Sequence, residues 1–261
     1  GALRLPENAF EADEEKRRAA LRQRAGAEKS LAALGEPGPG FRFIGPSSLP
    51  EGAGAEAEDW EAEAAGEAGR YGISSLEAGG AQGGRKFGEL VHALLARLGS
   101  YDRAGVDALA EEARAAAAGF GLSDKEIGEA VAMIRGATEG ALFGRIAASG
   151  RVFRELPVLM REGDWILRGV ADLVFEEGGA LVVVDFKTDA VSGADVDRRA
   201  AHYRPQGAAY AMAAGAAAGQ EVREVIFAFL RPGAESAFPL DGAAREEVRR
   251  AAGRIHAGRE A

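Results

Sequence analysis

The sequence predicts an α/β protein in which helices flank a central mixed β-sheet. Two apolar, β-rich runs on either side of Gly178-Gly179 predict a hairpin, segments with apolar residues at helical spacing precede it, and a further helix and strand follow it. The 261 residues are enough for one large α/β domain, or for one domain with appendages. We therefore expect an antiparallel meander with further strands, covered by helices.

Composition divides the chain near residue 80. Residues 11–34 are rich in Ala, Glu, Arg and Leu and predict a helix, whereas residues 35–69 are a low-complexity mixture of Gly, Pro, Ala and Glu that is typical of a linker. The segment up to Gly80 has 15 acidic and 9 basic residues, against 26 and 23 in the remainder. The sequence thus predicts a helical and flexible segment over residues 1–80 and a folded domain over residues 81–261.

The overall composition excludes several classes of site. The formal net charge of −9 is unusual for a nucleic-acid binder, whose contact surface is normally basic. The absence of cysteine excludes disulfides, zinc–thiolate sites and iron–sulfur clusters and allows a reducing cytoplasm. No apolar run reaches about 20 residues, and the first residues lack the charged and apolar regions of a signal peptide, so we expect a cytoplasmic protein without a membrane partner. The chain begins Gly-Ala rather than Met, which indicates a fragment of a longer polypeptide.

Helical segments precede the predicted hairpin. Apolar residues recur at helical spacing over residues 85–98, and His92 lies beside this stripe, where a histidine is either a structural residue or a ligand. Residues 102–120 are rich in Ala and Glu and predict a second helix. Residues 123–126 form a capping box that starts a third helix, which runs towards residue 146 and in which Gly136 and Gly140 favour a break.

The central hairpin brings acidic residues together. A two-residue turn at the glycines places Glu177 opposite Ala180, and counting back from there places Asp172 opposite Asp185. Lys187 shares the face of Asp185, because side chains alternate along a strand. Directly opposed carboxylates lie roughly 5 Å apart and repel each other, which favours a bound cation. The alternative is that both aspartates are solvated edge residues.

A strand upstream contributes a further carboxylate. Residues 152–160 predict this strand, and a loop at residues 162–163 places Glu155 opposite Val170, on the same face as Asp172. Three carboxylates and a lysine would then share one side of a three-stranded meander. The alternative is that Glu155 is an exposed strand residue.

After the hairpin, a helix is predicted to begin near Tyr203, with Pro205 in its first turn. Tyr203, Gln206 and Tyr210 follow the i, i+3 and i+7 spacing of one helix face, which is either a polar contact surface or a packing face. The remaining predicted elements are strands at residues 221–230 and 235–240 and a helix at residues 243–256.

Five short motifs follow one another in a recognisable order. They are Gly88-Glu-Leu-Val-His92, Glu155-Leu-Pro-Val158, Gly169-Val-Ala-Asp172, Asp185-Phe-Lys187-Thr188 and Tyr203-Arg-Pro-Gln206-Gly-Ala-Ala-Tyr210. Between about residues 85 and 230 the chain resembles the RecB-family nuclease domain of the PD-(D/E)XK superfamily. It is most similar in style to the C-terminal nuclease of AddA-type and UvrD/Rep-like repair helicases, of the exonuclease V type. The lack of cysteine argues against the AddB-like and Cas4-like branches, which carry an iron–sulfur cluster.

The resemblance implies a restriction-endonuclease-like core and a metal centre. By this resemblance His92, Asp172 and Asp185 hold a divalent metal, and the backbone carbonyl of Phe186 is a further ligand. Lys187 is the implied catalytic lysine, acting with the two aspartates. Oxygen ligands with one imidazole suit Mg²⁺ or Mn²⁺ better than zinc.

The same resemblance implies supporting residues around this centre. Glu155 matches a position that supports the catalytic groups. Tyr203, Gln206 and Tyr210 match the motif that contacts DNA or orders the site.

These observations predict a metal-dependent DNA nuclease module in double-strand break repair and recombination. The expected partners are single-stranded DNA ends, the helicase motor domains of the same longer polypeptide and a second helicase–nuclease subunit. The printed sequence has no Walker A motif, so a motor would have to come from elsewhere. The alternatives are a catalytically weak DNA-binding or docking module that keeps the nuclease fold, and a stand-alone restriction-like endonuclease, which would need a sequence-reading element.

Overall fold

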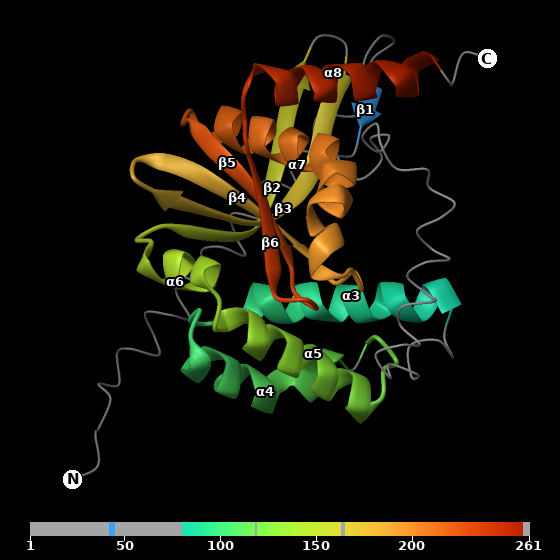
Figure 1. Cartoon of the computed structure of the whole chain (residues 1–261), viewed down its shortest axis with the longest axis vertical. Coiled ribbons are helices and arrows are strands. Elements are labelled where there is room, and N and C mark those ends of the chain that lie inside the picture. Colours follow the sequence, from blue (N-terminus) through green and yellow to red (C-terminus); the bar gives the residue numbers. More distant parts are fainter. Residues whose placement is uncertain (1–41, 45–79, 118, 163–164, 258–261) are drawn as a thin grey trace.

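The computed structural model describes residues 42–44, 80–117, 119–162 and 165–257 (Figure 1). Its elements in chain order are β1 (Arg42–Ile44), α3 (Gly80–Arg97), α4 (Arg103–Ala117), α5 (Asp124–Thr138), α6 (Ala141–Ala148), β2 (Val152–Glu162), β3 (Trp165–Glu177), β4 (Ala180–Lys187), the 3₁₀ turn η3 (Gly193–Asp195), α7 (Val196–Ala218), β5 (Val222–Phe229), β6 (Ala234–Pro239) and α8 (Gly242–Ala257). None of the described helices is both long and apolar enough to cross a membrane.

The strands form one mixed sheet. Its order is β1-β3-β4-β5-β6, and β2 also pairs with β3. The β1–β3 and β4–β5 pairs are parallel, whereas β2–β3, β3–β4 and β5–β6 are antiparallel. The parallel β4–β5 pair requires a crossover, which α7 provides. The predicted α/β class, with an antiparallel meander extended by further strands, is confirmed.

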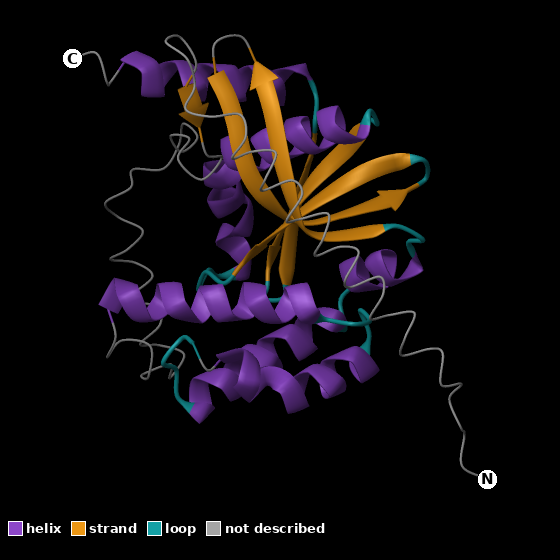
Figure 2. Ribbon diagram, turned by 180° about the vertical axis from the view of Figure 1, so that it is seen from behind, coloured by secondary structure: helices purple, strands orange, loops and turns teal. Residues whose placement is uncertain are grey.

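Helices cover both faces of the sheet (Figures 1 and 2). Because side chains alternate along a strand, neighbouring residues of β4 enter different cores. Val183 packs with α7 and α8 on one face, whereas Val182 and Val184 pack with α3 to α6 on the other. This burial on both faces explains the continuous apolar run of β4.

The predicted register of the central hairpin is confirmed as far as Leu173 and Val184, whereas the predicted pair of Asp172 and Asp185 lies beyond the end of the ladder. Glu177 pairs with Ala180, and the ladder continues in this register to Leu173 and Val184. Gly178 and Gly179 have φ angles of 60° and 82°, which only glycine adopts without strain in a two-residue turn.

The predicted register between β2 and β3 is wrong by two residues. Glu162 pairs with Trp165 rather than lying in the loop, and Leu156 pairs with Ala171. Glu155 is therefore opposed to Asp172, not to Val170. Moving the loop by one residue changes the opposed position by two, so the predicted face of Glu155 is unchanged.

The helix after the hairpin begins earlier than predicted. α7 starts at Val196, and Pro205 lies in its interior rather than in its first turn. A proline there removes one helical hydrogen bond and crowds the preceding turn, and α7 changes direction along its length in Figure 1. Tertiary packing outweighs this cost, because the residues around Pro205 are buried against the sheet.

The capping box and the break in the helix that follows it are both confirmed. Ser123 and Glu126 form the capping box, the helix that it starts ends at Thr138, and a second helix begins at Ala141. Gly140 provides the extended residue that separates the two. The helix predicted over residues 11–34 and the linker over residues 35–69 lie outside the described residues, so the division at residue 80 stays a prediction.

Candidate metal centre

The candidate site lies where β3 and β4 separate. Their ladder runs from the glycine turn only as far as Leu173 and Val184, after which β4 continues beside β5 to Lys187. Asp172 occupies the fork, and its Oδ2 accepts a hydrogen bond of 2.9 Å from the backbone N–H of Phe186. Where the two strands separate, the Asp172 carboxylate therefore accepts the hydrogen bond that a backbone carbonyl would accept in a regular sheet.

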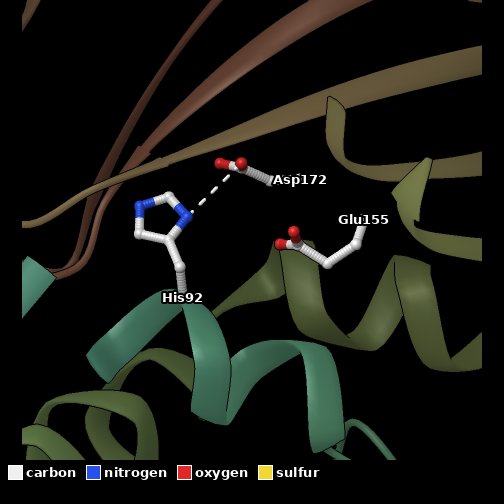
Figure 3. A group of neighbouring side chains, drawn as sticks. All are labelled: His92, Glu155 and Asp172. Carbon is white, nitrogen blue, oxygen red and sulfur yellow. Dashed lines mark ion pairs between the residues drawn. The ribbon is translucent and has the colours of Figure 1, made fainter. Parts of the chain in front are cut away.

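Three half-buried side chains converge at this fork (Figure 3). His92 comes from α3, which crosses the end of the sheet, while Glu155 comes from β2 and Asp172 from β3. One ligand atom from each residue lies within 4.8 Å of the other two. His92 Nδ1 is 3.3 Å from Asp172 Oδ1. The elements α3, β2 and β3 therefore each supply one candidate metal ligand to a common centre.

The backbone of Glu155 is unusual for its residue type. Its φ of 47° lies in the left-handed region, and it is the one non-glycine residue with a positive φ in the described part of the chain. Such a conformation costs on the order of 1–3 kcal/mol and persists only where the surrounding structure holds it. The bordering pairs Arg154–Leu173 and Leu156–Ala171 hold it here and direct Glu155 towards the cluster.

Lys187 is held beside this cluster by residues of two elements. Its ammonium lies 2.9 Å from Asp185 Oδ1 and donates a hydrogen bond of 3.3 Å to Gln206 Oε1. It also lies 4.0 Å from the centre of the Tyr203 ring, which provides a cation–π contact. The side chains of Lys187 and Asp185 are only 12% and 7% exposed, so this is a nearly buried ion pair.

The negative charges of the site change the pKa values of its groups. Burial lowers the pKa of His92, but the hydrogen bond with Asp172 and the charges of Asp172 and Asp185 outweigh it, so the net pKa is raised above its ordinary value. Burial raises the pKa of Asp185 to about 6, against the opposing charge of Lys187. The shift of His92 shows that the site attracts positive charge, whereas that of Asp185 reflects mainly its burial.

The α7 residues predicted to contact DNA or order the site lie against Lys187 and its surroundings. The Tyr203 hydroxyl donates a 2.8 Å hydrogen bond to Asp189 and accepts one of 2.7 Å from Arg199. Burial and the negative charge of nearby carboxylates raise the pKa of Tyr210. Tyr203 and Gln206 therefore contact Lys187 directly, whereas Tyr210 lies one helical turn beyond Gln206.

The predicted site residues are arranged in two adjoining groups. His92, Glu155 and Asp172 make up the convergent cluster, and among the described residues Asp185 lies outside that cluster and pairs with Lys187. Phe186 links the groups through its N–H bond to Asp172. The roles of Asp185 and of the Phe186 carbonyl as ligands stay predictions.

Two residues of the site were not predicted from the sequence. Asp189 and Arg199 form an ion pair of 2.8 Å that fixes the Tyr203 hydroxyl. Arg199 precedes Tyr203 by four residues, the spacing of neighbours on a helix surface. This relation was hidden because the helix was predicted to begin after Arg199.

The donor set fits a divalent cation. Two carboxylates and one imidazole from separate elements converge, their surroundings are negative, and oxygen-rich sets of this kind bind hard divalent metals. The carboxylates of Glu155 and Asp172 repel each other, and a bound cation would neutralise their charge.

Comparison with known proteins identifies a family whose sequence model matches this chain. The sequence model described as the PD-(D/E)XK nuclease superfamily matches residues 70–259. No curated protein is significantly similar to the chain. A solved structure described as "Crystal structure of SSO0001" is 17% identical, with 60% of this chain and 70% of that chain covered and a TM-score of 0.30.

Proposed function

Because the chain belongs to the PD-(D/E)XK nuclease superfamily, whose members are generally metal-dependent nucleases, we propose that it is a deoxyribonuclease that hydrolyses phosphodiester bonds with Mg²⁺ or Mn²⁺. The observation that carries this proposal is the convergence of His92, Glu155 and Asp172 next to the Lys187–Asp185 pair. A structural role alone does not account for three converging metal-ligand donors beside a buried lysine.

The residues of the cluster have distinct proposed roles. His92, Glu155 and Asp172 would hold the cation, with Asp185 and the Phe186 carbonyl as the further ligands that the family resemblance implies. Bound there, the cation would neutralise charge on the phosphate and lower the pKa of an attacking water. The N–H of Phe186 keeps Asp172 in place through a 2.9 Å hydrogen bond.

Lys187 is the proposed electrostatic catalyst. Asp185, Gln206 and the Tyr203 ring orient its ammonium, so no reorganisation is needed when negative charge develops on the phosphate. We propose direct in-line attack by water, with no covalent enzyme intermediate.

The biological setting is proposed from the order of the five motifs. We propose a RecB-like module of an AddA-type helicase–nuclease that acts in double-strand break repair and recombination in the cytoplasm. Its substrate would be single-stranded DNA ends, delivered by helicase motor domains of the same longer polypeptide and by a second subunit. The segment over residues 1–80 would be the tether to the motor.

Cleavage of labelled single-stranded DNA by the 261-residue chain, with Mg²⁺ or Mn²⁺, tests the activity. We expect cleavage that requires the metal and that is lost in Asp185→Ala and Lys187→Ala, with the circular dichroism spectrum unchanged. Glu112→Ala and Lys125→Ala, on the exposed surfaces of α4 and α5, are the matched controls and should retain activity.

The outcome separates the enzyme from a docking module. A folded wild-type chain that binds DNA but cleaves it with neither metal would contradict the nuclease and favour a catalytically weak binding module. Equal activity in the wild type and Lys187→Ala would contradict the role of the lysine. Stimulation of cleavage by added motor subunits and ATP is the test for the helicase setting.

A further inference from the structure

A half-buried arginine lies next to the end of β4, the strand that carries Lys187. Arg231 follows β5, in the turn that leads to β6, and its Nε donates a 3.3 Å hydrogen bond to the carbonyl of Thr188, the residue after Lys187. The preceding residue, Leu230, donates its N–H to the carbonyl of Lys187 at 2.9 Å. The turn is therefore bound to the segment that carries the catalytic lysine.

The same arginine reaches the helix that carries His92. Its guanidinium lies 5.6 Å from the centre of the Phe87 ring in α3. The next residue, Gly88, packs against the same segment, because a Cβ there would be 3.3 Å from Thr188 Oγ1. His92 lies one helical turn further along α3 than Gly88. Arg231 thus contacts both α3, which carries His92, and the segment at the end of β4 that carries Lys187.

Among the described residues, no carboxylate is a direct partner of the Arg231 charge. Within the described part of the chain no carboxylate forms an ion pair with it, and its terminal nitrogens make no hydrogen bond. Burial lowers its pKa, although the more distant charges of Glu129 and Asp189 oppose this. Other half-buried arginines of the fold, Arg145 and Arg199, each pair with a carboxylate at 2.8 Å. A desolvated cation without a counter-ion opposes folding, which favours a role in binding an anion.

We infer that Arg231 binds a backbone phosphate of the nucleic-acid substrate, next to the phosphate that is cleaved. This inference rests on the proposed nuclease function. With Nε bound to the carbonyl of Thr188 and the guanidinium 5.6 Å from the centre of the Phe87 ring, the position of the two terminal nitrogens is set in advance for a phosphate. The contact brings a cation to a chain whose net charge of −9 otherwise repels nucleic acid.

Three variants test this inference in the 261-residue chain. Arg231→Met removes the charge and keeps most of the apolar stem, and Arg231→Lys keeps the charge without the planar fork. Arg250→Met is the matched control, because Arg250 is exposed on α8, at the opposite end of the molecule from α3 (Figure 1). The measurements are the Kd for a fluorescent single-stranded oligonucleotide at several KCl concentrations, kcat and KM with Mn²⁺, and Tm.

For Arg231→Met we expect Kd and KM to rise about tenfold, as for the loss of one charge-assisted hydrogen-bonded contact, with kcat within about threefold of wild type. The slope of log K against log salt should fall by roughly 0.7. Arg231→Lys should recover the salt slope but only part of the affinity. Tm should stay within about 3 °C of wild type, because a desolvated charge is removed together with a single hydrogen bond.

The results distinguish this inference from the proposed function. If the wild type cleaves DNA and Arg231→Met has the same Kd, KM and salt slope as Arg250→Met, the inference alone is overturned. A large loss of Tm with unchanged affinity would make Arg231 a structural residue and would also overturn it. If the wild type neither binds nor cleaves DNA, the proposed function fails and takes the inference with it.

Discussion

The ammonium of Lys187 contacts one charged residue, Asp185, and two uncharged residues, Gln206 and Tyr203. Its ion pair with Asp185, at 2.9 Å, compensates a carboxylate that is almost completely buried. Gln206 and the Tyr203 ring orient the lysine from α7 but carry no charge in this arrangement. Removing the lysine therefore affects both the proposed catalytic cation and the ion pair that compensates the charge of Asp185.

We predict that Lys187→Met abolishes cleavage without weakening the metal site. Activity should fall by at least about 100-fold, as when an electrostatic catalyst is lost. Without metal, Tm should fall, because a buried carboxylate left without its partner costs about 3–5 kcal/mol. Mn²⁺ should bind as tightly as in wild type or more tightly, because a competing cation is gone, and should restore Tm.

Calorimetric titration with Mn²⁺ and thermal unfolding with and without the metal measure these effects. Lys125→Met, on the exposed surface of α5, is the control. Restoration of Tm by Mn²⁺ is expected if Asp185 is a metal ligand. A variant that no longer binds Mn²⁺ would show that Lys187 shapes the metal site itself.

At the scale of elements, the approach of α7 to the sheet depends on one glycine. A Cβ at Gly207 would lie 2.7 Å from Phe227 and 2.9 Å from Val225, both on β5. The adjoining residue Gln206 contacts Lys187. The close packing of α7 on β5 therefore sets the position of a residue that contacts the proposed catalytic lysine.

We predict that Gly207→Ala destabilises the protein although alanine favours a helix. The added methyl group overpacks the contact with Phe227 and should cost about 1–3 kcal/mol, more than the gain of about 1 kcal/mol in helix propensity. Gly136→Ala is the matched control, because Gly136 is exposed in α5 with nothing within 4 Å of its Cβ position.

Urea unfolding measures both glycine variants. The control should gain about 0.5–1 kcal/mol, so the two substitutions are expected to change stability in opposite directions. Equal stabilisation in both would mean that α7 moves away from β5 at no cost. In that case cleavage should also change, because Gln206 would move with the helix.

At the scale of the whole molecule, an ionic network joins elements far from the metal centre. Arg145 of α6 bonds Glu177 at 2.8 Å and Glu224 of β5 at 2.6 Å, and Arg223 also pairs with Glu177. The hydrogen bonds from Arg145 and Arg223 lower the pKa of Glu177 to about 2. The network thus ties the end of the central hairpin to α6 and β5.

We predict that this network contributes to stability above pH 4.5 and is lost in acid. The pKa of Glu177 is lower in the folded than in the unfolded chain, where it is about 4.3, so its contribution falls as the pH drops from 4.5 towards 2. Since Glu177 is 34% exposed, solvent screening reduces the effect to about 1 kcal/mol.

Thermal unfolding between pH 2 and pH 7 compares Glu177→Gln with wild type. The variant should have a lower Tm at pH 7, and the two curves should converge near pH 2. Glu112→Gln, exposed on α4, is the control and should follow the wild type throughout. A constant difference between the Glu177→Gln and wild-type curves at every pH would assign the effect to packing rather than to charge.

The sequence by itself determined the α/β class, the capping box of α5 and the register of the central hairpin. These features depend on contacts a few residues apart, such as the positive φ angles that Gly178 and Gly179 supply. It also indicated the residue types of the site, because the motifs carry them in order. The register of Glu155 was missed, since a loop displaced by one residue moves the opposed position by two.

Only the tertiary structure decided how distant groups meet. The approach of His92 to Asp172, the contact of Gln206 with Lys187 and the position of Arg231 behind Thr188 all depend on how α3, α7 and the β5–β6 turn pack on the sheet. Such packing is set by the fit of many buried side chains at once, which no local pattern specifies.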